Sequence, residues 1–410
     1  MKVFIKTYGC TLNQADSDIM VGELNKKGHR IVSENEADVI ILNTCTVKGT
    51  TEHKILAKLN KLKDKKVVVA GCLTVNQGKI EQVLPNAPLV SARSVDKIND
   101  AVELAIKGEK QVFRKPVSKE NLIRIITSPI LRIGISEGCV SSCSFCQTKL
   151  ARPGLSSLSP RKIVDTINEG VESGAVEIQL TSMDSGAYGK DLRINLIDLL
   201  KTINEKVNDK VMIRLGMINP DHVKRMLKEM IYELKGEMFY KFLHVPVQTG
   251  SEKVCKDMNR DHSVKDYYEI VEYVRKQIPN MTISTDIIVG YPTETEDDFK
   301  KTVELIKKTK PEVVNISKFT PRPGTKAKKL KQLSTKVIKQ RSRKVSELVH
   351  EILNEADSKY VGKTVEVVVT EKGKARMKNY KQVVVDSKNI VGSRIKVKIK
   401  SFRNGSLFAF

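Results

Sequence analysis

Short, nearly continuous runs of apolar residues recur through the first quarter of this chain. The runs Lys2–Tyr8, Asp38–Asn43 and Lys66–Ala70 have the length of strands, and helical patterns such as Asp16–Lys27 separate them. Strands that are apolar on both faces are typical of a parallel sheet that helices cover on both sides. The pattern therefore predicts a Rossmann-like parallel α/β domain over residues 1–112.

The same alternation of strands and helices resumes after the basic linker Lys107–Lys119. Helical patterns such as Pro160–Ser173 and Thr295–Lys308 lie among six further apolar runs, which are Leu131–Ser136, Val176–Thr181, Val211–Leu215, Phe242–Val247, Thr282–Val289 and Val313–Phe319. Successive β–α units of this kind predict a partial, open (βα)6 barrel over residues 125–354. A last helical pattern, Thr335–Asn354, is expected to lead the chain out of that barrel.

The final segment, residues 355–410, differs because its apolar runs are short and turn residues separate them. The runs are Thr364–Thr370, Gln382–Asp386, Arg394–Lys400 and Leu407–Phe410. Short strands at close spacing predict a small antiparallel β-barrel. The whole chain is therefore expected to be an α/β multidomain protein with three units.

The chain carries a large excess of positive charge, with 72 Lys+Arg against 48 Asp+Glu and a formal net charge of +24. Part of the excess lies in Asp357–Phe410, where 13 basic residues oppose four acidic ones, and Lys326–Lys344 holds nine basic residues and no acidic one. Such an imbalance favours a polyanionic partner, above all nucleic acid. A Lys-rich, solvated surface is the alternative.

Basic residues and one tyrosine gather between two of the strands expected in the C-terminal segment. The group consists of Lys374, Arg376, Lys378, Tyr380 and Lys381. Basic side chains neutralise phosphates and an aromatic ring can stack on a base, so we expect these residues to contact RNA. A solvated charged face is again the alternative.

The sequence also predicts where the protein works. No apolar run approaches the about 20 residues needed to cross a membrane, so we expect no membrane partner. The chain begins without a signal-peptide pattern, and its seven cysteines, an odd number, do not favour a disulfide framework. We therefore expect a cytoplasmic protein.

Three cysteines in the middle of the chain, Cys139, Cys143 and Cys146, have the spacing C-x3-C-x2-C. Thiolates hold iron–sulfur clusters, and a [4Fe-4S] cluster that receives only three of them keeps one iron open to another ligand. Half of a zinc site and a group of thiols without metal are the alternatives. No matching C-x2-C or H-x3-H pair occurs elsewhere in the sequence, which weighs against zinc.

A second group of cysteines follows the three predicted N-terminal strands. Cys10, Cys45 and Cys72 each lie just past the end of one strand. The carboxyl ends of parallel strands share one edge of a sheet, so these thiols are expected to converge and to form another three-ligand metal site. Alternatively, each is a small buried residue at a turn. Cys255 lies in a helical pattern, and His244 lies in a strand pattern. We interpret both as buried residues that bind no metal.

These residues together resemble a known family. A C-x3-C-x2-C loop after the first strand of a βα barrel is similar to that of the radical S-adenosylmethionine (radical SAM) enzymes. With the upstream motifs Tyr8–Cys10, Asn43–Cys45 and Ala70–Cys72, nearly the whole chain resembles the methylthiotransferases, which end in a TRAM domain. The motifs Phe242–Ser251, Thr285–Pro292 and Phe319–Thr325 resemble later parts of their barrel. The segments Leu180–Asp191 and Leu215–Pro220 are similar to the archaeal and eukaryotic threonylcarbamoyladenosine tRNA methylthiotransferase branch.

The resemblance implies two [4Fe-4S] clusters, one for each group of three cysteines, and S-adenosylmethionine at the open iron of the central cluster. It implies a radical reaction at C2 of N6-threonylcarbamoyladenosine next to the anticodon of tRNA, with sulfur donated at the N-terminal cluster. No protein side chain is then expected to be catalytic, because the cofactors carry the difficult step. The residues expected to bind S-adenosylmethionine are Phe145, Thr181, Ser182, Gln248 and Asp286.

Three other functions stay open at this point. Two of them belong to the same family, namely methylthiolation of isopentenyladenosine in tRNA and of an aspartate in a ribosomal protein. The third is a non-catalytic iron–sulfur protein that binds RNA. Two incomplete ligand sets weigh against the third, because structural clusters are normally fully ligated. The sequence identifies neither the sulfur donor nor the electron donor.

Overall fold

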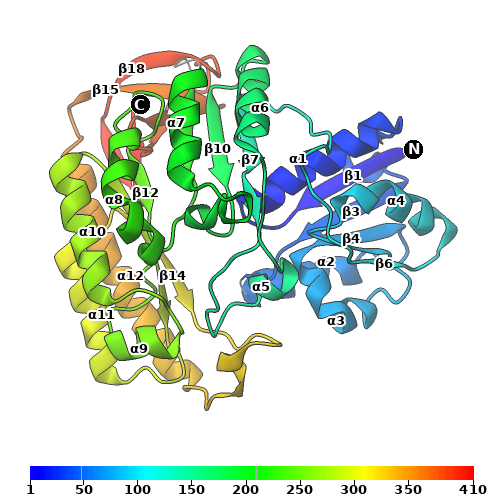
Figure 1. Ribbon diagram of the computed structural model, residues 1–410, viewed down its shortest axis with the longest axis horizontal. Helices are drawn as coiled ribbons and strands as arrows, with labels where there is room; N and C mark the ends of the chain where they lie inside the picture. The colour runs from blue at the N-terminus through cyan, green and yellow to red at the C-terminus, as the bar shows by residue number, and fades with distance from the viewer. Residues whose placement is uncertain (48, 208–210) are drawn as a thin grey trace.

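The computed structural model describes residues 1–47, 49–207 and 211–410. Figure 1 shows an N-terminal α/β unit beside a curved array of strands and helices, with a small C-terminal sheet at one end of that array. The three units follow one another along the chain in the order that the sequence predicts.

The N-terminal unit contains a six-stranded parallel sheet with the strand order β2-β1-β3-β4-β5-β6. Every residue of β3 and β4 is buried, which explains why both strands are apolar throughout. The three predicted strands are confirmed, but β2, β5 and β6 have only two or three residues and leave no readable pattern. The strands are β1 (Lys2–Thr7), β2 (Arg30–Ile31), β3 (Val39–Thr44), β4 (Val67–Gly71), β5 (Leu89–Ser91) and β6 (Val112–Phe113).

Helices cover both faces of this sheet. Buried side chains of α1 (Thr11–Lys26) and α4 (Ile98–Lys107) pack on one face. Those of α2 (Gly49–Asn60) and α3 (Gln77–Glu81) pack on the other. Helix α1 also lies against strand β7 (Ile130–Gly134) of the second unit, so it belongs to the boundary between the two (Figure 1).

The second unit is the expected partial barrel of six parallel strands. Its strands form the two sheets β11-β10-β7 and β12-β13-β14, and a parallel bridge between Ile213 and Phe239 links them. Strand β12 is shorter than predicted, because the chain after His244 makes only single bridging contacts with its neighbour. The strands after β7 are β10 (Glu177–Thr181), β11 (Met212–Leu215), β12 (Phe242–His244), β13 (Thr282–Val289) and β14 (Val313–Lys318).

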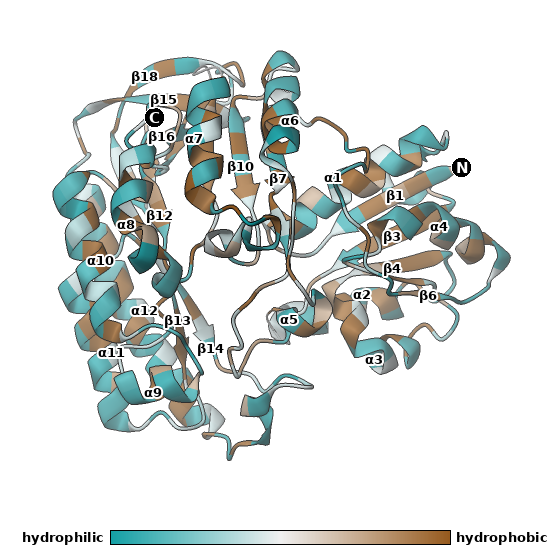
Figure 2. Ribbon diagram, in the orientation of Figure 1, coloured by the Kyte–Doolittle hydropathy of each residue, from teal (hydrophilic) through white to brown (hydrophobic). Residues whose placement is uncertain are grey.

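Helices surround the barrel and begin at residues that suit a helix N-terminus. Asn195, Ser263 and Thr295 each form a capping box with an aspartate three residues later, which satisfies free backbone N–H groups. The helices of this unit are α5 (Thr148–Ala151), α6 (Pro160–Glu172), α7 (Leu196–Lys206), α8 (Pro220–Leu234), α9 (Glu252–Asp257), α10 (Val264–Gln277), α11 (Glu296–Thr309) and α12 (Thr335–Ser358). Buried apolar residues of α6, α7, α8, α10, α11 and α12 share one hydrophobic core with the strands. Figure 2 shows hydrophobic and hydrophilic positions alternating along these helices.

The C-terminal unit is a curled six-stranded sheet with the order β18-β15-β16-β17-β20-β19. Its neighbouring strands are antiparallel except for β17 and β20, which pair in parallel. The strands are β15 (Thr364–Glu371), β16 (Lys374–Met377), β17 (Gln382–Val384), β18 (Arg394–Lys398), β19 (Ser401–Arg403) and β20 (Ser406–Phe408). Lys374 and Arg376 were expected between strands, but they lie within β16, whose charged residues alternate with buried ones.

This sheet packs against the end of the barrel where the strands begin. The Tyr380 ring lies 4.8 Å from the ring of Tyr240 and 4.9 Å from that of Phe242, between centroids. Its hydroxyl donates to Glu177, the first residue of β10, at 3.2 Å. Burial and the Glu177 carboxylate raise the pKa of Tyr380 to about 12, so the hydroxyl stays protonated as a donor. The C-terminal sheet and the carboxyl ends of the strands therefore lie at opposite ends of the barrel.

In the part of the chain that the structure describes, no helix is long and apolar enough to cross a membrane.

Replacement of Tyr380 tests how the C-terminal sheet is held. We expect Tyr380→Ala to lower the free energy of unfolding by about 2 kcal/mol or more, because a partly buried ring is lost. Tyr380→Phe keeps the ring and loses one hydrogen bond, which costs about 1 kcal/mol. Chemical denaturation of the full chain measures both, and equal effects of the two substitutions would contradict the packing account.

Candidate functional site

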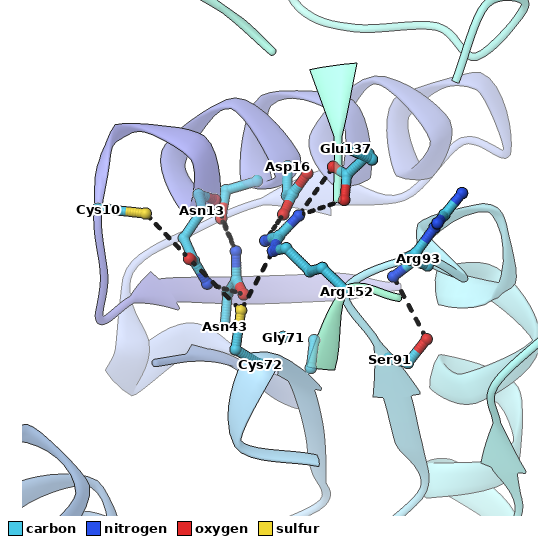
Figure 3. A network of polar contacts seen from close by, with 12 residues as sticks. Cys10, Asn13, Asp16, Asn43, Gly71, Cys72, Ser91, Arg93, Glu137 and Arg152 are labelled. Carbon is cyan, nitrogen blue, oxygen red and sulfur yellow. Dashed lines mark hydrogen bonds and ion pairs between the residues drawn. The ribbon is translucent and has the colours of Figure 1, made fainter. Parts of the chain in front are cut away.

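The three N-terminal cysteines converge at one edge of their sheet. Cys45 and Cys72 follow β3 and β4 directly and are buried, whereas Cys10 is exposed at the start of α1. The thiols of Cys10 and Cys72 lie 3.4 and 3.8 Å from the same oxygen, Asn13 Oδ1. Figure 3 shows Cys10 and Cys72 on either side of Asn13. Cys45 interacts electrostatically with both of these cysteines, so the three side chains lie near one another, as the parallel-strand argument predicts.

A glycine makes this convergence possible. Gly71 precedes Cys72 and has φ +91°, a conformation that residues with a Cβ rarely adopt. A Cβ there would lie 2.3 Å from Asn43 Oδ1 and 2.5 Å from the Thr44 carbonyl oxygen. The end of β4 thus approaches β3 so closely that only glycine fits beside Cys45 and Cys72.

The central cysteine loop follows β7 and lies between the two antiparallel strands of a short hairpin, β8 (Ser136–Glu137) and β9 (Ser156–Ser157). Gly138 turns the chain into the loop at φ +80°, and a Cβ there would lie 1.6 Å from the Gly154 carbonyl oxygen. Cys139, Cys143 and Cys146 are all partly exposed. The loop therefore carries three partly exposed cysteines after the carboxyl end of the first barrel strand.

Burial and charge keep several of these thiols protonated when nothing is bound to them. Burial raises the pKa of Cys72 to about 11, and neighbouring Cys10 and Cys45 add to this while Arg152 opposes it. Burial, with a contribution from Asp184, raises the pKa of Cys139 to about 11. Metal coordination replaces such protons, so ligand binding at these sites must release them.

The donor set fits an iron–sulfur cluster in its chemistry. Six thiols in two groups of three are soft ligands, as iron–sulfur clusters require. Among the described residues, no three His, Cys, Asp or Glu side chains are gathered closely enough to hold a single metal ion. Beside Cys143, the guanidinium of Arg260 donates to the thiol sulfur at 3.3 Å, and its buried Nε has no hydrogen-bond partner in the described part of the chain.

A buried arginine joins the two groups of cysteines. Arg152 is 1% exposed, and its Nε donates to Cys72 Sγ at 3.2 Å. Its Nη1 donates to both carboxylate oxygens of Glu137, at 2.8 and 2.7 Å, and its Nη2 donates to Asp16 at 2.5 Å (Figure 3). Glu137 lies two residues before Cys139, so one guanidinium connects the N-terminal thiols to the start of the central loop.

Lys119 completes this network of buried charges. Its ammonium group donates to Asp16 at 2.5 Å and also pairs with Glu137. Burial acts to raise the pKa of Glu137, but Arg152 and Lys119 outweigh it and hold that pKa at about 2. Two positive and two negative side chains therefore balance each other in the space between the two units.

A second buried arginine makes a similar link on the other side. Arg322 follows β14, and its Nη2 donates to the Thr46 carbonyl oxygen and to Glu52, each at 2.6 Å. Its Nε donates to Gln147 Oε1 at 3.1 Å. Thr46 is next to Cys45 and Gln147 is next to Cys146, and their side chains hydrogen-bond at 2.5 Å. The two cysteine groups are thus held together at two places.

The residues predicted to bind S-adenosylmethionine lie on different elements of the second unit. Phe145 lies in the central loop and packs with the buried residues around Tyr291 and Phe319, while Thr181 ends β10 and Ser182 follows it. Gln248 follows β12 with φ +71°. Asp286 lies in the middle of β13, where it contacts His244 at 3.1 Å and Asn315 at 2.8 Å. The sequence does not show which position of a long strand reaches the barrel rim.

The residues expected to bind RNA are largely engaged within the protein. Lys381 is buried and pairs with Asp357, and the Tyr380 ring is packed against the barrel. Lys378 pairs with Glu237 at 2.8 Å, Lys374 pairs with Glu371 at 3.0 Å, and the Arg376 guanidinium lies over the Tyr380 ring. Tyr380 and Lys381 therefore help to hold the sheet in place, and the contact of this group with RNA stays a prediction.

Sequence reasoning missed several polar residues of the site. Asp184 is fully buried and accepts hydrogen bonds from Asn219 Nδ2 at 2.6 Å and from the His222 ring at 3.0 Å. Arg260 reaches Cys143 and donates to Asn219 at 2.7 Å. None of them lies in a spacing pattern that signals a site, although Asp184 and Asn219 belong to the two segments that resemble the tRNA methylthiotransferase branch.

Removal of Arg152 tests the buried network. We expect Arg152→Met to lower the free energy of unfolding of the cluster-free protein by about 3–5 kcal/mol, because two buried carboxylates, Asp16 and Glu137, then have only Lys119 to balance their charge. Arg161→Met is the matched control, since Arg161 is 91% exposed and pairs only with Asp165. Denaturant unfolding measures the free energy of unfolding of both variants. Similar losses of stability in the two would contradict the claim that the buried network stabilises the protein.

Comparisons with known proteins agree with this architecture. Residues 133–306 match the radical SAM superfamily, and residues 2–92 match the uncharacterized protein family UPF0004. Among solved structures, the radical S-adenosylmethionine methyltransferase TsrM from Kitasatospora setae, with cobalamin and a [4Fe-4S] cluster bound, superposes with a TM-score of 0.58 at 12% identity, over 80% of this chain and 77% of that one. At that identity the likeness shows the fold alone.

Curated relatives match over nearly the full length. A probable threonylcarbamoyladenosine tRNA methylthiotransferase of Archaeoglobus fulgidus is 44% identical over 98% of this chain and 97% of its own, and one of Pyrococcus horikoshii is 40% identical over 94% and 93%. The threonylcarbamoyladenosine tRNA methylthiotransferase of Drosophila melanogaster is 35% identical over 98% of this chain and 76% of its own. This chain therefore belongs to the threonylcarbamoyladenosine tRNA methylthiotransferase family, within the radical SAM superfamily.

Proposed function

We propose that this protein adds a methylthio group to C2 of N6-threonylcarbamoyladenosine next to the anticodon of tRNA. The relatives named for this activity span archaea and animals and align with almost the whole chain. The observation that carries the proposal is the pair of three-cysteine groups, which buried hydrogen bonds of Arg152 and Arg322 link between the two units. The proposed reaction requires such an arrangement, because the N-terminal group would donate sulfur close to where the central group generates the radical.

Each group of cysteines would hold one [4Fe-4S] cluster. Cys10, Cys45 and Cys72 supply the thiolates of one, and Cys139, Cys143 and Cys146 supply those of the other. When bound, the clusters and S-adenosylmethionine supply a carbon-centred radical, sulfur and a methyl group, none of which protein side chains can provide. The protein's own residues bind and orient these groups and the substrate, and they exclude water from the site.

Several side chains around the central loop suit S-adenosylmethionine. The unpartnered Nε of Arg260 is a buried donor for its carboxylate, and a charge-assisted hydrogen bond of this kind is strong. Phe145 would pack against the adenine, and Thr181 and Ser182 would meet the amino group at the end of β10. Gln248 and Asp286 would line the pocket deeper inside the barrel.

The remaining assignments are part of the same proposal. The units are taken as residues 1–112, 125–354 and 355–410. The RNA contacts proposed for the last unit are those of the predicted group, Lys374, Arg376, Lys378, Tyr380 and Lys381. The protein would work in the cytoplasm with a sulfur donor and an electron donor that are unidentified. An isopentenyladenosine substrate, a ribosomal-protein aspartate and a non-catalytic RNA-binding role are the competing functions.

Nucleoside analysis of tRNA tests the substrate. We expect tRNA from a host that lacks the activity to gain 2-methylthio-N6-threonylcarbamoyladenosine when this protein is expressed, as measured by mass spectrometry. The Cys139→Ala variant is the control and should give none of this nucleoside. A methylthio group on isopentenyladenosine, on protein aspartate, or on neither would refute the proposal.

Triple substitutions separate the two cysteine groups. After anaerobic reconstitution, we expect C10A/C45A/C72A to keep roughly half of the wild-type iron and sulfide. This variant should still cleave S-adenosylmethionine reductively but should add no methylthio group. C139A/C143A/C146A should keep a similar share of iron and lose the cleavage. Stoichiometric zinc in place of iron, or cleavage by both variants, would contradict the assignment.

A further inference from the structure

The segment between β14 and α12 is attached to the central cysteine loop and to the N-terminal unit. The backbone N–H of Ala327 donates to the Ser144 carbonyl oxygen at 3.0 Å, and Gln147 Nε2 donates to the Pro323 carbonyl oxygen at 3.0 Å. Ala327 is fully buried beside Phe145. With Arg322 bound to Thr46 and Glu52, the backbone of this segment is fixed where the two cysteine groups meet.

The side chains of the same segment form a cluster of positive charge. Lys326, Lys328, Lys329 and Lys331 are all exposed, and we call these four residues the η6 lysine patch after the short helix η6 (Lys326–Lys329). Among the described residues, no carboxylate forms an ion pair with any of the four. Figure 2 shows the segment between β14 and α12 as strongly hydrophilic.

The three lysines of the C-terminal group that the sequence predicts to contact RNA differ in this respect. Lys374, Lys378 and Lys381 all pair with carboxylates, and Lys381 is buried. That sheet also packs against the opposite end of the barrel from the cysteine loop. Unpaired positive charge beside the cysteine loop therefore comes from the η6 lysine patch and not from the predicted C-terminal group.

We propose that the η6 lysine patch binds backbone phosphates of the RNA next to the nucleotide that enters the site. This inference rests on the proposed function and says which surface grips the RNA at the reaction centre. The rigidly held backbone sets the register of the RNA, and the flexible lysines neutralise its phosphates without reading its sequence. The C-terminal sheet then contacts a more distant part of the same RNA.

An acidic protein, such as an electron donor, is the other partner that the charge would suit. Lysine is depleted in the cores of protein–protein interfaces, which rely on buried aromatic and arginine anchors. Of the large hydrophobic side chains between Lys326 and Lys331, the structure exposes only Leu330, at 41%. Closely spaced lysines without aromatic anchors therefore favour phosphates over a protein surface.

The test compares two reconstituted full-length variants with equal loss of charge. The patch variant is K326Q/K328Q/K329Q/K331Q. The control is K61Q/K63Q/K65Q/K66Q, since these four lysines are exposed, lie before β4 and so occupy the edge of the N-terminal sheet away from its cysteines. Fluorescence anisotropy with a labelled tRNA anticodon stem-loop measures affinity at several salt concentrations, and iron content and thermal unfolding check that each variant is folded.

We expect the patch variant to bind the stem-loop at least about tenfold more weakly, and its slope of log affinity against log salt to fall by roughly 3, at about 0.7–0.9 per phosphate contact. The control should change affinity less than about twofold. Equal losses of stem-loop affinity in the two variants would overturn the inference. It would also be overturned if the patch variant bound the stem-loop as tightly as wild type but was reduced less well by an acidic electron-transfer protein. If wild-type protein binds no RNA, the proposed function fails as well, whereas failure of the patch alone leaves it standing.

Discussion

The arrangement of this protein depends on one buried guanidinium. Arg152 contacts Cys72, Asp16 and Glu137 at the same time, and these residues belong to the N-terminal sheet, to helix α1 and to the hairpin that begins the central cysteine loop. Burying these charges is costly unless each one finds its partners, so the network is satisfied only when the two units are seated together. A cysteine ligand of one group and the entry to the other are thereby fixed relative to each other. Arg322 repeats this link beside Cys45 and Cys146.

The spacing of the cysteines and the pattern of apolar runs predict much of this arrangement of the two cysteine groups. The six cysteines stand out because three form one loop and three follow strands whose ends must share an edge. The buried strands β3 and β4 and the long β13 are visible as apolar runs. Strands of two or three residues, such as β2 and β6, are too short to leave a pattern, and their pairing depends on neighbours that are already folded.

The parts that could not be predicted are contacts between distant residues. Asp16 and Arg152 are 136 positions apart, and no local pattern marks them as partners. The same limit explains the C-terminal barrel, where Tyr380 and Lys381 look like RNA contacts in the sequence. Whether a basic or aromatic side chain is free depends on the residues that face it. Here Glu177 at the start of β10 faces Tyr380, and Asp357 faces Lys381.

The two ends of the barrel therefore have separate tasks. One end receives the C-terminal sheet, and the other brings the cysteine groups together. The measurement that tests this most directly is electron paramagnetic resonance of the full-length protein with both clusters reduced. If Arg152 and Arg322 hold the clusters close together, the wild-type spectrum will show spin–spin broadening that the summed spectra of C10A/C45A/C72A and C139A/C143A/C146A lack. A wild-type spectrum equal to that sum would contradict the account.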